Sequence, residues 1–323
     1  MTRPSVEFTS REGAGRGARG EPASRSPRSV VALGVFDGVH RGHQEIFRQV
    51  VARAKAVRGT SVVYTFDPHP VTVVAPSAAP KMINTIRQRV ALIEDCGIDR
   101  VVVQNFTKEF SQQTPEQFFE RVIVERLKAR ELFAGYNFTF GVRRSGTAET
   151  LEALARRVGI DVHVVSPFLV GETLVSSTQV RQFLAAGDLP RAEELLARSY
   201  FIEGKVVKGR GIGGKELGLH TANLDSENDA ILPTGVYVSF ATAGGRRFRS
   251  VTNIGPNPTF GSGPVTIETH ILEGFRRNIV GRRIRVEFLQ KIREEIRFAT
   301  PSDLANQIRS DIQMAARVFA ERK

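Results

Sequence analysis

The chain has 323 residues, of which 41% are apolar and 25% charged, and 46 basic against 34 acidic side chains give a formal net charge of +12. This composition is that of globular proteins and excludes collagen-like, coiled-coil and wholly disordered chains, while the length predicts about two domains. No apolar run reaches the about 18 residues that span a bilayer, no apolar leader opens the chain, and a single cysteine excludes an internal disulfide. We therefore expect a cytoplasmic protein with no membrane partner.

Residues 1–29 are rich in Gly, Ser, Pro and Arg and contain few apolar side chains. Such a segment buries too little surface to offset the entropy lost on ordering, so we expect a disordered tail. Six arginines and three glutamates give this tail +3 of the +12. A solubilising extension is favoured over an RNA-binding arm, because aromatic residues that stack on bases are scarce among the arginines.

Strands and helices alternate after the tail, and the first strand, Val30–Phe36, is a continuous apolar run. Further strands are predicted at Ser61–Phe66, Arg100–Val103, Leu132–Gly135 and Val162–Val165. Helices are predicted at His43–Val57, Ile86–Cys96, from Thr114 onward, at Ala148–Val158, Ser177–Ala186 and Leu189–Ala197. This alternation predicts an α/β domain with a parallel, Rossmann-like sheet whose strands are buried on both faces.

The pattern changes after Ser199 to short β-branched and aromatic runs separated by Gly, Pro and Asn, such as Val236–Phe240 and Ile284–Phe288. These runs predict a compact antiparallel β-barrel, and an amphipathic pattern over Ser302–Glu321 predicts a C-terminal helix packed on it. The expected division is a first domain at 30–186, a helical linker at 187–199 and a second domain at 200–323.

The end of the first strand carries the motif Gly-Val-Phe-Asp-Gly-Val-His-Arg-Gly-His at residues 34–43. Glycines at a strand-to-helix turn let a phosphate approach the backbone, and the helix N-terminus attracts its charge. His40 and His43 can then stabilise the charge that develops on a phosphorus during transfer. Two unrelated surface histidines are the alternative, and the number of matched positions disfavours it. The motif residues expected to contact phosphate are Gly34, Phe36, Asp37, Gly38 and Gly42.

A second cluster, Ser176-Ser177-Thr178 followed by Arg181, lies at the start of a predicted helix. Hydroxyls at a helix start cap the backbone or donate to phosphate, and the planar fork of Arg181 suits phosphate oxygens. Capping alone explains the hydroxyls equally well. The histidine motif adds weight to a phosphate role, because both ends of a nucleotide-binding sheet can flank one ligand.

The 34–43 motif resembles the HxGH element of the nucleotidyltransferase superfamily. With Phe66-Asp-Pro-His-Pro70 and Gly135-Tyr-Asn-Phe-Thr-Phe-Gly141, the chain from about Val30 to its C-terminus resembles the bacterial bifunctional riboflavin kinase/FAD synthetase family. The resemblance implies that the first domain transfers AMP from ATP to FMN. The resemblance also implies residue roles. His40 and His43 would assist the transfer, Ser176, Ser177 and Arg181 would hold ATP phosphates, and Asn137 would bind a nucleotide or flavin phosphate. Asp67 and His69 are candidates for flavin binding, with capping of a strand end as an equal alternative.

The predicted barrel contains a glycine-rich loop with Gly209, Gly211 and Lys215, which suits phosphate binding but is equally typical of a connector. Thr221 and Asn223 are two residues apart, so in a strand both oxygens face one side and form half a shell for Mg²⁺. Glu268 lies within a β-branched run, where it can serve as a general base toward a primary hydroxyl.

These segments resemble the riboflavin kinase barrel of the same family, in which Thr and Asn of a Pro-Thr-Ala-Asn motif bind Mg-ATP and a glutamate is the base. The resemblance carries these roles to Thr221, Asn223 and Glu268. Leu219 and His220 stand where the family usually has Phe-Pro. Without proline's fixed φ the approach to Thr221 is looser, so we expect the kinase activity to persist but to be weakened.

The leading interpretation is an enzyme that phosphorylates riboflavin to FMN in the barrel and adenylylates FMN to FAD, with release of pyrophosphate, in the first domain. Its partners are riboflavin, FMN, FAD and ATP with Mg²⁺ as cofactor, and no nucleic acid; self-association is left open. One alternative is an FMN adenylyltransferase with a regulatory barrel. Another is a basic RNA-binding protein, which the absence of Trp and the presence of only four Tyr disfavour.

Overall fold

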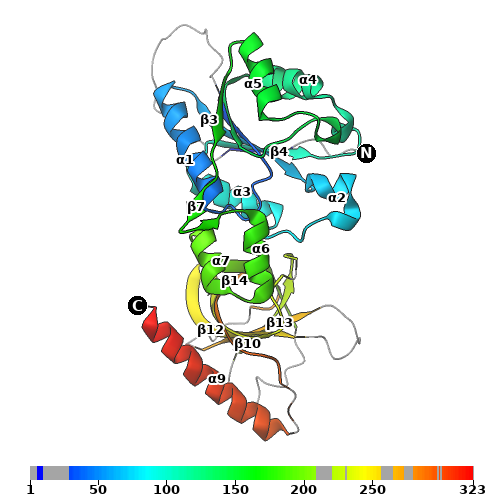
Figure 1. Cartoon of the computed structure of the whole chain (residues 1–323). Helices are drawn as coiled ribbons and strands as arrows, with labels where there is room; N and C mark the ends of the chain where they lie inside the picture. The colour runs from blue at the N-terminus through cyan, green and yellow to red at the C-terminus, as the bar shows by residue number, and fades with distance from the viewer. Residues whose placement is uncertain are drawn as a thin grey trace. The chain divides into compact units, whose positions relative to one another are not determined.

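The computed structural model describes residues 6–9, 29–208, 220–229, 231–255, 265–272, 279–296, 298 and 300–322. The chain divides into two compact units (Figure 1). Unit 1 comprises residues 1–80 and 86–175, and unit 2 comprises residues 81–85 and 176–323. The predicted boundaries at 186 and 199 stay predictions, whereas the division by contacts falls at 175.

Unit 1 is built on a six-stranded sheet of order β1-β4-β3-β2-β5-β6. Its strands are β1 Val6–Thr9, β2 Ser29–Leu33, β3 Thr60–Asp67, β4 Arg100–Asn105, β5 Ala129–Gly135 and β6 Asp161–Val165. Strands β2 to β6 are parallel, as predicted, and β1 runs antiparallel to β4.

The prediction of disorder across 1–29 is wrong at two places. Val6–Thr9 pairs with the outer edge of β4, and Ser29 already belongs to β2. An edge strand offers a row of free backbone N–H and C=O groups, and the short Val-Glu-Phe-Thr run accepts that template. Residues 1–5 and 10–28 lie outside the described part of the chain.

Helices cover both faces of this sheet (Figure 1). The helices of unit 1 are α1 Arg41–Ala56, α2 Pro70–Val74, α3 Ile86–Asp95, α4 Pro115–Phe118 with a π-helical continuation Phe119–Arg126, and α5 Ala148–Arg157. Short 3₁₀ helices lie at Pro76–Ala78, Phe110–Gln112 and Val142–Arg144, and a small hairpin joins β7 Leu169–Val170 to β8 Thr173–Leu174.

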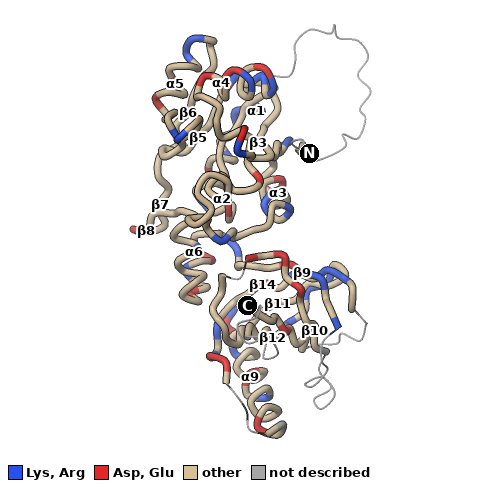
Figure 2. Tube along the Cα trace, turned by 90° about the vertical axis from the view of Figure 1, so that its right-hand side faces the viewer, with Lys and Arg blue, Asp and Glu red and all other residues tan. Residues whose placement is uncertain are grey.

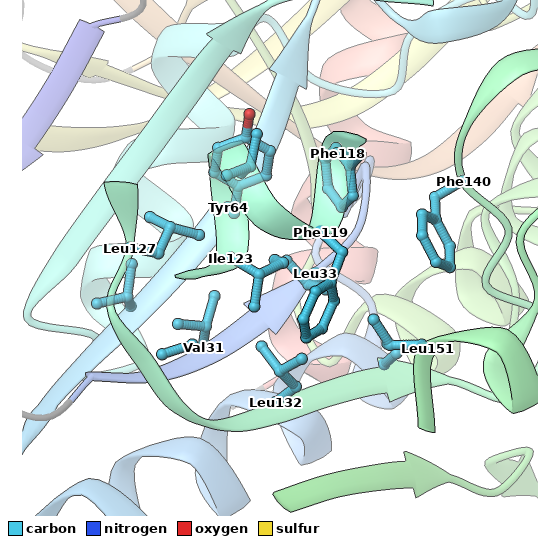
Figure 3. Packing of buried hydrophobic residues seen from close by; sticks show 14 of the residues in the cluster. Val31, Leu33, Tyr64, Phe118, Phe119, Ile123, Leu127, Leu132, Phe140 and Leu151 are labelled. Atoms are coloured by element: carbon cyan, nitrogen blue, oxygen red, sulfur yellow. The ribbon is translucent and has the colours of Figure 1, made fainter. Parts of the chain in front are cut away.

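The alternation of side chains along β2 produces two hydrophobic clusters. Val31 and Leu33 face the cluster formed with the π-helical segment and α5, which Figure 3 shows. Val30 and Ala32 face the other cluster, formed with α1 and α3. All five residues of β2 are buried, because the strand has helices on both sides.

Unit 2 contains the predicted closed antiparallel barrel, with strand order β10-β13-β12-β11-β14-β9. Its strands are β9 Tyr200–Val207, β10 His220–Ser226, β11 Gly235–Ala243, β12 Arg246–Gly255, β13 Thr266–Ile271 and β14 Arg283–Arg293. Its helices are α6 Ser177–Ala186, α7 Leu189–Leu196 and α9 Pro301–Glu321. The last helix packs on the barrel, as predicted, through Ala315, Val318 and Phe319 against Val251 and Leu289.

Residues 81–85, here called the crossing segment, cluster with unit 2 although their neighbours on both sides belong to unit 1. Arg181 Nε donates to the Lys81 carbonyl oxygen at 2.7 Å, and Arg198 Nη2 donates to Asn84 Oδ1 at 3.2 Å. The Met82 amide donates to Asp229 Oδ2 at 2.5 Å. These hydrogen bonds tie the segment to α6, to the end of α7 and to the loop after β10.

Candidate active sites

The loop after β2 has an unusual backbone and close packing. Phe36 has φ 56° and Val39 has φ 42°, a region that costs energy for residues with a Cβ and that is concentrated at functional sites. The Phe36 ring is buried and turns back over Gly34, where a Cβ would lie 2.9 Å from Phe36 Cζ. A glycine at position 34 is therefore required by the ring, whatever its relation to phosphate.

The structure brings the two predicted histidines together at the start of α1. His40 is the N-cap residue, and its Nδ1 accepts a hydrogen bond from the His43 amide at 3.4 Å. The two imidazoles stack with centroids 3.5 Å apart. Gly42 makes room for this arrangement, since a Cβ there would lie 3.3 Å from His40 Nδ1. The two imidazoles therefore lie side by side at this turn.

Arg89, which the sequence analysis did not select, connects two loops of unit 1. Its guanidinium is buried and donates to the carbonyl oxygens of Val35 at 2.9 Å and Phe66 at 2.7 Å. Burial lowers the pKa of Arg89, while the charges of Asp37 and Asp67 act in the opposite direction. Arg89 lies among the buried residues of its helix. A basic residue on an apolar helix face was the sequence signal that could have identified it.

Asp67 is the last residue of β3, and His69 lies two positions beyond it. Asp67 is exposed, and its carbonyl oxygen accepts from the Phe106 amide at 3.0 Å. His69 is the N-cap of α2, with Nδ1 accepting from the Val71 amide at 3.1 Å. His69 therefore caps a helix rather than a strand end, and its contact with flavin stays a prediction.

Asn137 lies exposed in the turn after β5, closed by a hydrogen bond from the Phe138 amide to the Gly135 carbonyl oxygen. The histidine loop, Asp67 and Asn137 thus lie at the carboxyl ends of β2, β3 and β5. These three strands are adjacent in the sheet. The carboxyl edge of adjacent parallel strands is where ligands bind in open α/β sheets.

The second predicted cluster belongs to unit 2. Ser176 caps α6, its Oγ accepting from the Gln179 amide at 3.2 Å, and Arg181 Nε is engaged by the Lys81 carbonyl. Ser177 and Thr178 occupy the first turn of α6. Because this cluster and the histidines fall in different units, their joint action on one ligand stays a prediction.

The register of the strands determines which polar side chains of the barrel lie together. In the β10–β13 pair, Thr221 is opposite His270 and Asn223 is opposite Glu268. The intervening Ala222 is buried on the other face. Successive side chains of a strand alternate between the two faces, so the four polar side chains share one face. The predicted placement of Thr221 and Asn223 on one side is confirmed.

The register adds two residues, His270 and Asn253, that the sequence analysis did not select. His270 follows Glu268 by two positions, and that spacing in a strand was the available signal. Asn253 of β12 is opposite Glu268 on its other flank. Asn253 is close to Glu268 only because β12 pairs with β13, and no local sequence pattern indicates that pairing.

The electrostatics of this face favour a neutral imidazole beside a basic carboxylate. Thr221 Oγ1 and His270 Nδ1 are 2.9 Å apart. Burial raises the pKa of Glu268, and Glu295 raises it further. Burial lowers the pKa of His270, with Asp311 opposing that shift. The predicted loop residues Gly209, Gly211 and Lys215 lie outside the described residues.

Some of the arginines that contribute to the net positive charge form ion pairs or ring contacts with other side chains. Arg247 pairs with Glu287 at 2.7 Å and lies 3.6 Å from the centre of the Phe240 ring. Arg283 makes two hydrogen bonds to Glu227, at 2.7 and 2.6 Å. Figure 2 shows basic and acidic positions interspersed along both units.

Comparisons with known proteins match the two parts of the chain separately. Residues 23–179 match the FAD synthetase family model, and residues 196–319 match the riboflavin kinase family model. Fold and sites therefore define a two-domain enzyme of flavin nucleotide synthesis.

Relatives extend this match over most of the chain. A bifunctional riboflavin kinase/FMN adenylyltransferase from Haemophilus influenzae is 33% identical, with 90% of this chain and 94% of the relative covered. The protein of that name from Pseudomonas fluorescens is 36% identical, with 90% and 93% covered. The chain belongs to the bifunctional riboflavin kinase/FMN adenylyltransferase family, which confirms the predicted resemblance.

A crystal structure of a Streptococcus pneumoniae protein described as a macrolide-efflux protein shares the fold. Its TM-score is 0.79 at 28% identity, and the match covers 90% of this chain and 95% of that one. Within the described residues, no helix of this chain is both long enough and apolar enough to cross a membrane.

Proposed function

We propose that this chain makes FAD from riboflavin in two ATP-dependent steps, one in each unit, in the cytoplasm. The barrel phosphorylates riboflavin to FMN, and the α/β unit adenylylates FMN and releases pyrophosphate. The observation that carries the proposal is that both constellations occur in one family member: the stacked His40 and His43, and the paired Asn223 and Glu268.

In the adenylylation, a phosphate oxygen of FMN attacks the α-phosphorus of ATP, and pyrophosphate leaves. The imidazoles of His40 and His43 stabilise the charge that grows on the transferring group. Amides at the start of α1 and the residues around Gly38 hold phosphate oxygens. Asn137 orients the flavin or nucleotide phosphate. For Ser176, Ser177, Thr178 and Arg181 of unit 2, binding of ATP phosphates stays a prediction.

In the phosphorylation, Glu268 accepts the proton of riboflavin's terminal hydroxyl while that oxygen attacks the γ-phosphorus of ATP, and ADP leaves. A raised carboxylate pKa suits this role, because the efficiency of a general base grows with its basicity while it stays ionised. The hydroxyl of Thr221 and the amide oxygen of Asn223 are hard donors that fit Mg²⁺. Bound with ATP, Mg²⁺ neutralises phosphate charge.

Two single variants with separate substrates test the assignment. With MgATP and FMN, His43→Ala should abolish FAD formation, and with MgATP and riboflavin it should leave FMN formation intact. Glu268→Gln should give the reverse pattern. Chromatographic resolution of FMN, FAD and pyrophosphate reads out both reactions, and one variant that stops both from their own substrates would contradict the two-site assignment.

A second candidate is an FMN adenylyltransferase whose barrel is regulatory. The observation that favours it is His220, the first residue of β10, at the position of the family's proline. Under this alternative the unmodified chain forms little FMN, and His220→Pro raises FMN formation sharply while FAD formation from FMN stays constant.

A further inference from the structure

We propose that His270 is a positioning residue of the barrel site, whose Nδ1 accepts a hydrogen bond from the Thr221 hydroxyl and thereby leaves the lone pairs of that oxygen turned toward the bound cation. The inference rests on the proposed kinase function. It assigns a role to a side chain that no motif considered above includes.

Strand pairing places the two side chains face to face. Thr221 of β10 and His270 of β13 are directly opposite in the antiparallel register, with Thr221 Oγ1 and His270 Nδ1 2.9 Å apart. The next pair on the same face is Asn223 and Glu268. His270 therefore contacts a predicted cation ligand on the strand that carries the predicted base.

The direction of this hydrogen bond decides what the threonine oxygen can do. A hydroxyl donates one hydrogen and accepts through its lone pairs, and a neutral imidazole has one protonated and one unprotonated nitrogen. If Nδ1 accepts, the Thr221 hydrogen points at His270 and the lone pairs remain for a cation. If Nδ1 donates, it occupies a lone pair, and the hydroxyl hydrogen turns elsewhere. The tautomer with hydrogen on Nε2 therefore leaves both lone pairs for the cation, whereas the other tautomer leaves one.

The charged group that interacts with the ring is paired with other side chains. The Asp311 carboxylate accepts two hydrogen bonds from Arg293 at 2.9 and 2.8 Å and one from Gln307 at 2.9 Å. The β12 residue opposite His270 is the apolar Val251. Groups that fix the orientation of a metal ligand in this way typically change metal affinity about 10- to 100-fold when they are removed.

The tautomer is measured directly in the full chain by ¹⁵N-edited NMR of the histidine rings, of which the chain has six. The His270 signals are those lost in His270→Asn. We expect the Nε2–H tautomer in the wild type. The Thr221→Val variant, which removes the hydroxyl, should change the His270 nitrogen shifts and leave those of His40 and His43 unchanged. A wild-type ring with hydrogen on Nδ1 would overturn the proposal whether or not the kinase assignment holds.

Three variants separate positioning from mere packing. His270→Phe removes the acceptor, and the Mg²⁺ concentration for half-maximal FMN formation should rise about tenfold or more. His270→Asn keeps an acceptor near the Nδ1 position and should stay within about threefold of the wild type. Val251→Ala, a packing change on the neighbouring strand, should leave the Mg²⁺ requirement unchanged. FAD formation from FMN reports whether each variant is folded.

Two further outcomes are decisive. If His270→Phe leaves the Mg²⁺ requirement of the kinase unchanged, or if His270→Asn is as impaired as His270→Phe, the positioning role is wrong. Calorimetric titration of ADP with and without Mg²⁺ supplies a measurement that needs no turnover. The Mg²⁺-dependent gain in ADP affinity should shrink in His270→Phe only. If the wild type forms no FMN but shows the expected tautomer and Mg²⁺-dependent ADP binding, the proposed activity fails and the positioning role survives.

Discussion

Arg89 donates a hydrogen bond of 2.7 Å to the carbonyl oxygen of Phe66, and so ties helix α3 to the carboxyl end of β3. The same guanidinium reaches Val35, at the start of the histidine loop. Two adjacent strand ends, each followed by predicted ligand-binding residues, are therefore held by one buried cation.

Replacing Arg89 with methionine should destabilise the chain by about 3 kcal/mol, because it removes two hydrogen bonds from a buried, charged donor to the carbonyl oxygens of Val35 and Phe66. FAD formation from FMN should fall at least about tenfold, since the loops lose their common anchor. Urea unfolding followed by circular dichroism measures the first effect. Arg87→Met, at an exposed position of the same helix, is the matched control. Equal FAD formation by the two variants would contradict the anchoring role.

Replacing Gly42 with alanine should disturb the stacked imidazoles without unfolding the unit. The new Cβ would lie 3.3 Å from His40 Nδ1 and 3.5 Å from Phe168 Cβ, so the His40 ring must shift. A displacement of this kind costs about 10- to 100-fold in rate. The measurement is kcat/KM for FAD formation, with FMN formation by the barrel as an internal control. An unchanged kcat/KM would show that the ring position is not critical.

As the pH is lowered, the kinase should lose activity at a higher pH than the one at which an ordinary glutamate becomes protonated. Burial and the neighbouring Glu295 raise the pKa of Glu268, and the base works only when ionised. Removing one charge by Glu295→Gln lowers that pKa, so the acid limb of kcat/KM against pH should move to lower pH. The pH profile of FAD formation should not move. A limb that stays in place would exclude Glu295 as a cause.

The buried carboxylate of Glu131 should make unit 1 sensitive to acid. Arg53 donates to both of its oxygens, at 2.8 and 2.7 Å, and His163 Nε2 lies 3.0 Å away. The hydrogen bond from Arg53 lowers the pKa of Glu131 most, burial opposes this, and His163 lowers it further.

Because the folded pKa lies below the unfolded value of about 4.3, the stabilising contribution is present above that pH and is lost as pH falls through the folded pKa. Glu131→Gln should therefore cost about 1 to 2 kcal/mol at pH 7 and progressively less below about pH 4. Urea unfolding at several pH values measures this difference. A difference that stays constant down to pH 3 would contradict the assignment.

The features predictable from the sequence are those that a strand or helix encodes in its own spacing. The continuous apolar run from Val30 indicated a strand buried on both faces, and the two-residue spacing of Thr221 and Asn223 placed their side chains together. The Gly-x-Phe-Asp-Gly motif predicted the histidine turn. In each case the pattern and the structural consequence lie within a few residues of one another.

The features that escaped prediction depend on contacts between distant segments. The pairing of Val6–Thr9 with β4 requires a free sheet edge about 90 positions away. In the sequence Arg89 is one polar residue of an amphipathic helix. Its role depends on the carbonyl oxygens of Val35 and Phe66, which are distant in the chain. The partner of Thr221 is fixed by the register of β10 against β13, and a shift of one residue would present Thr269 instead.

The hydrogen bonds of the crossing segment bear on how this protein can be dissected. Residues 81–85 belong to unit 2 and are followed by more of unit 1, so the polypeptide passes from one unit to the other three times. A single cut in the chain therefore cannot release both units intact. A fragment ending at residue 175 would carry Lys81, Met82 and Asn84 without their partners Arg181, Asp229 and Arg198. Genetic separation of the two activities is therefore better done by point substitution than by truncation.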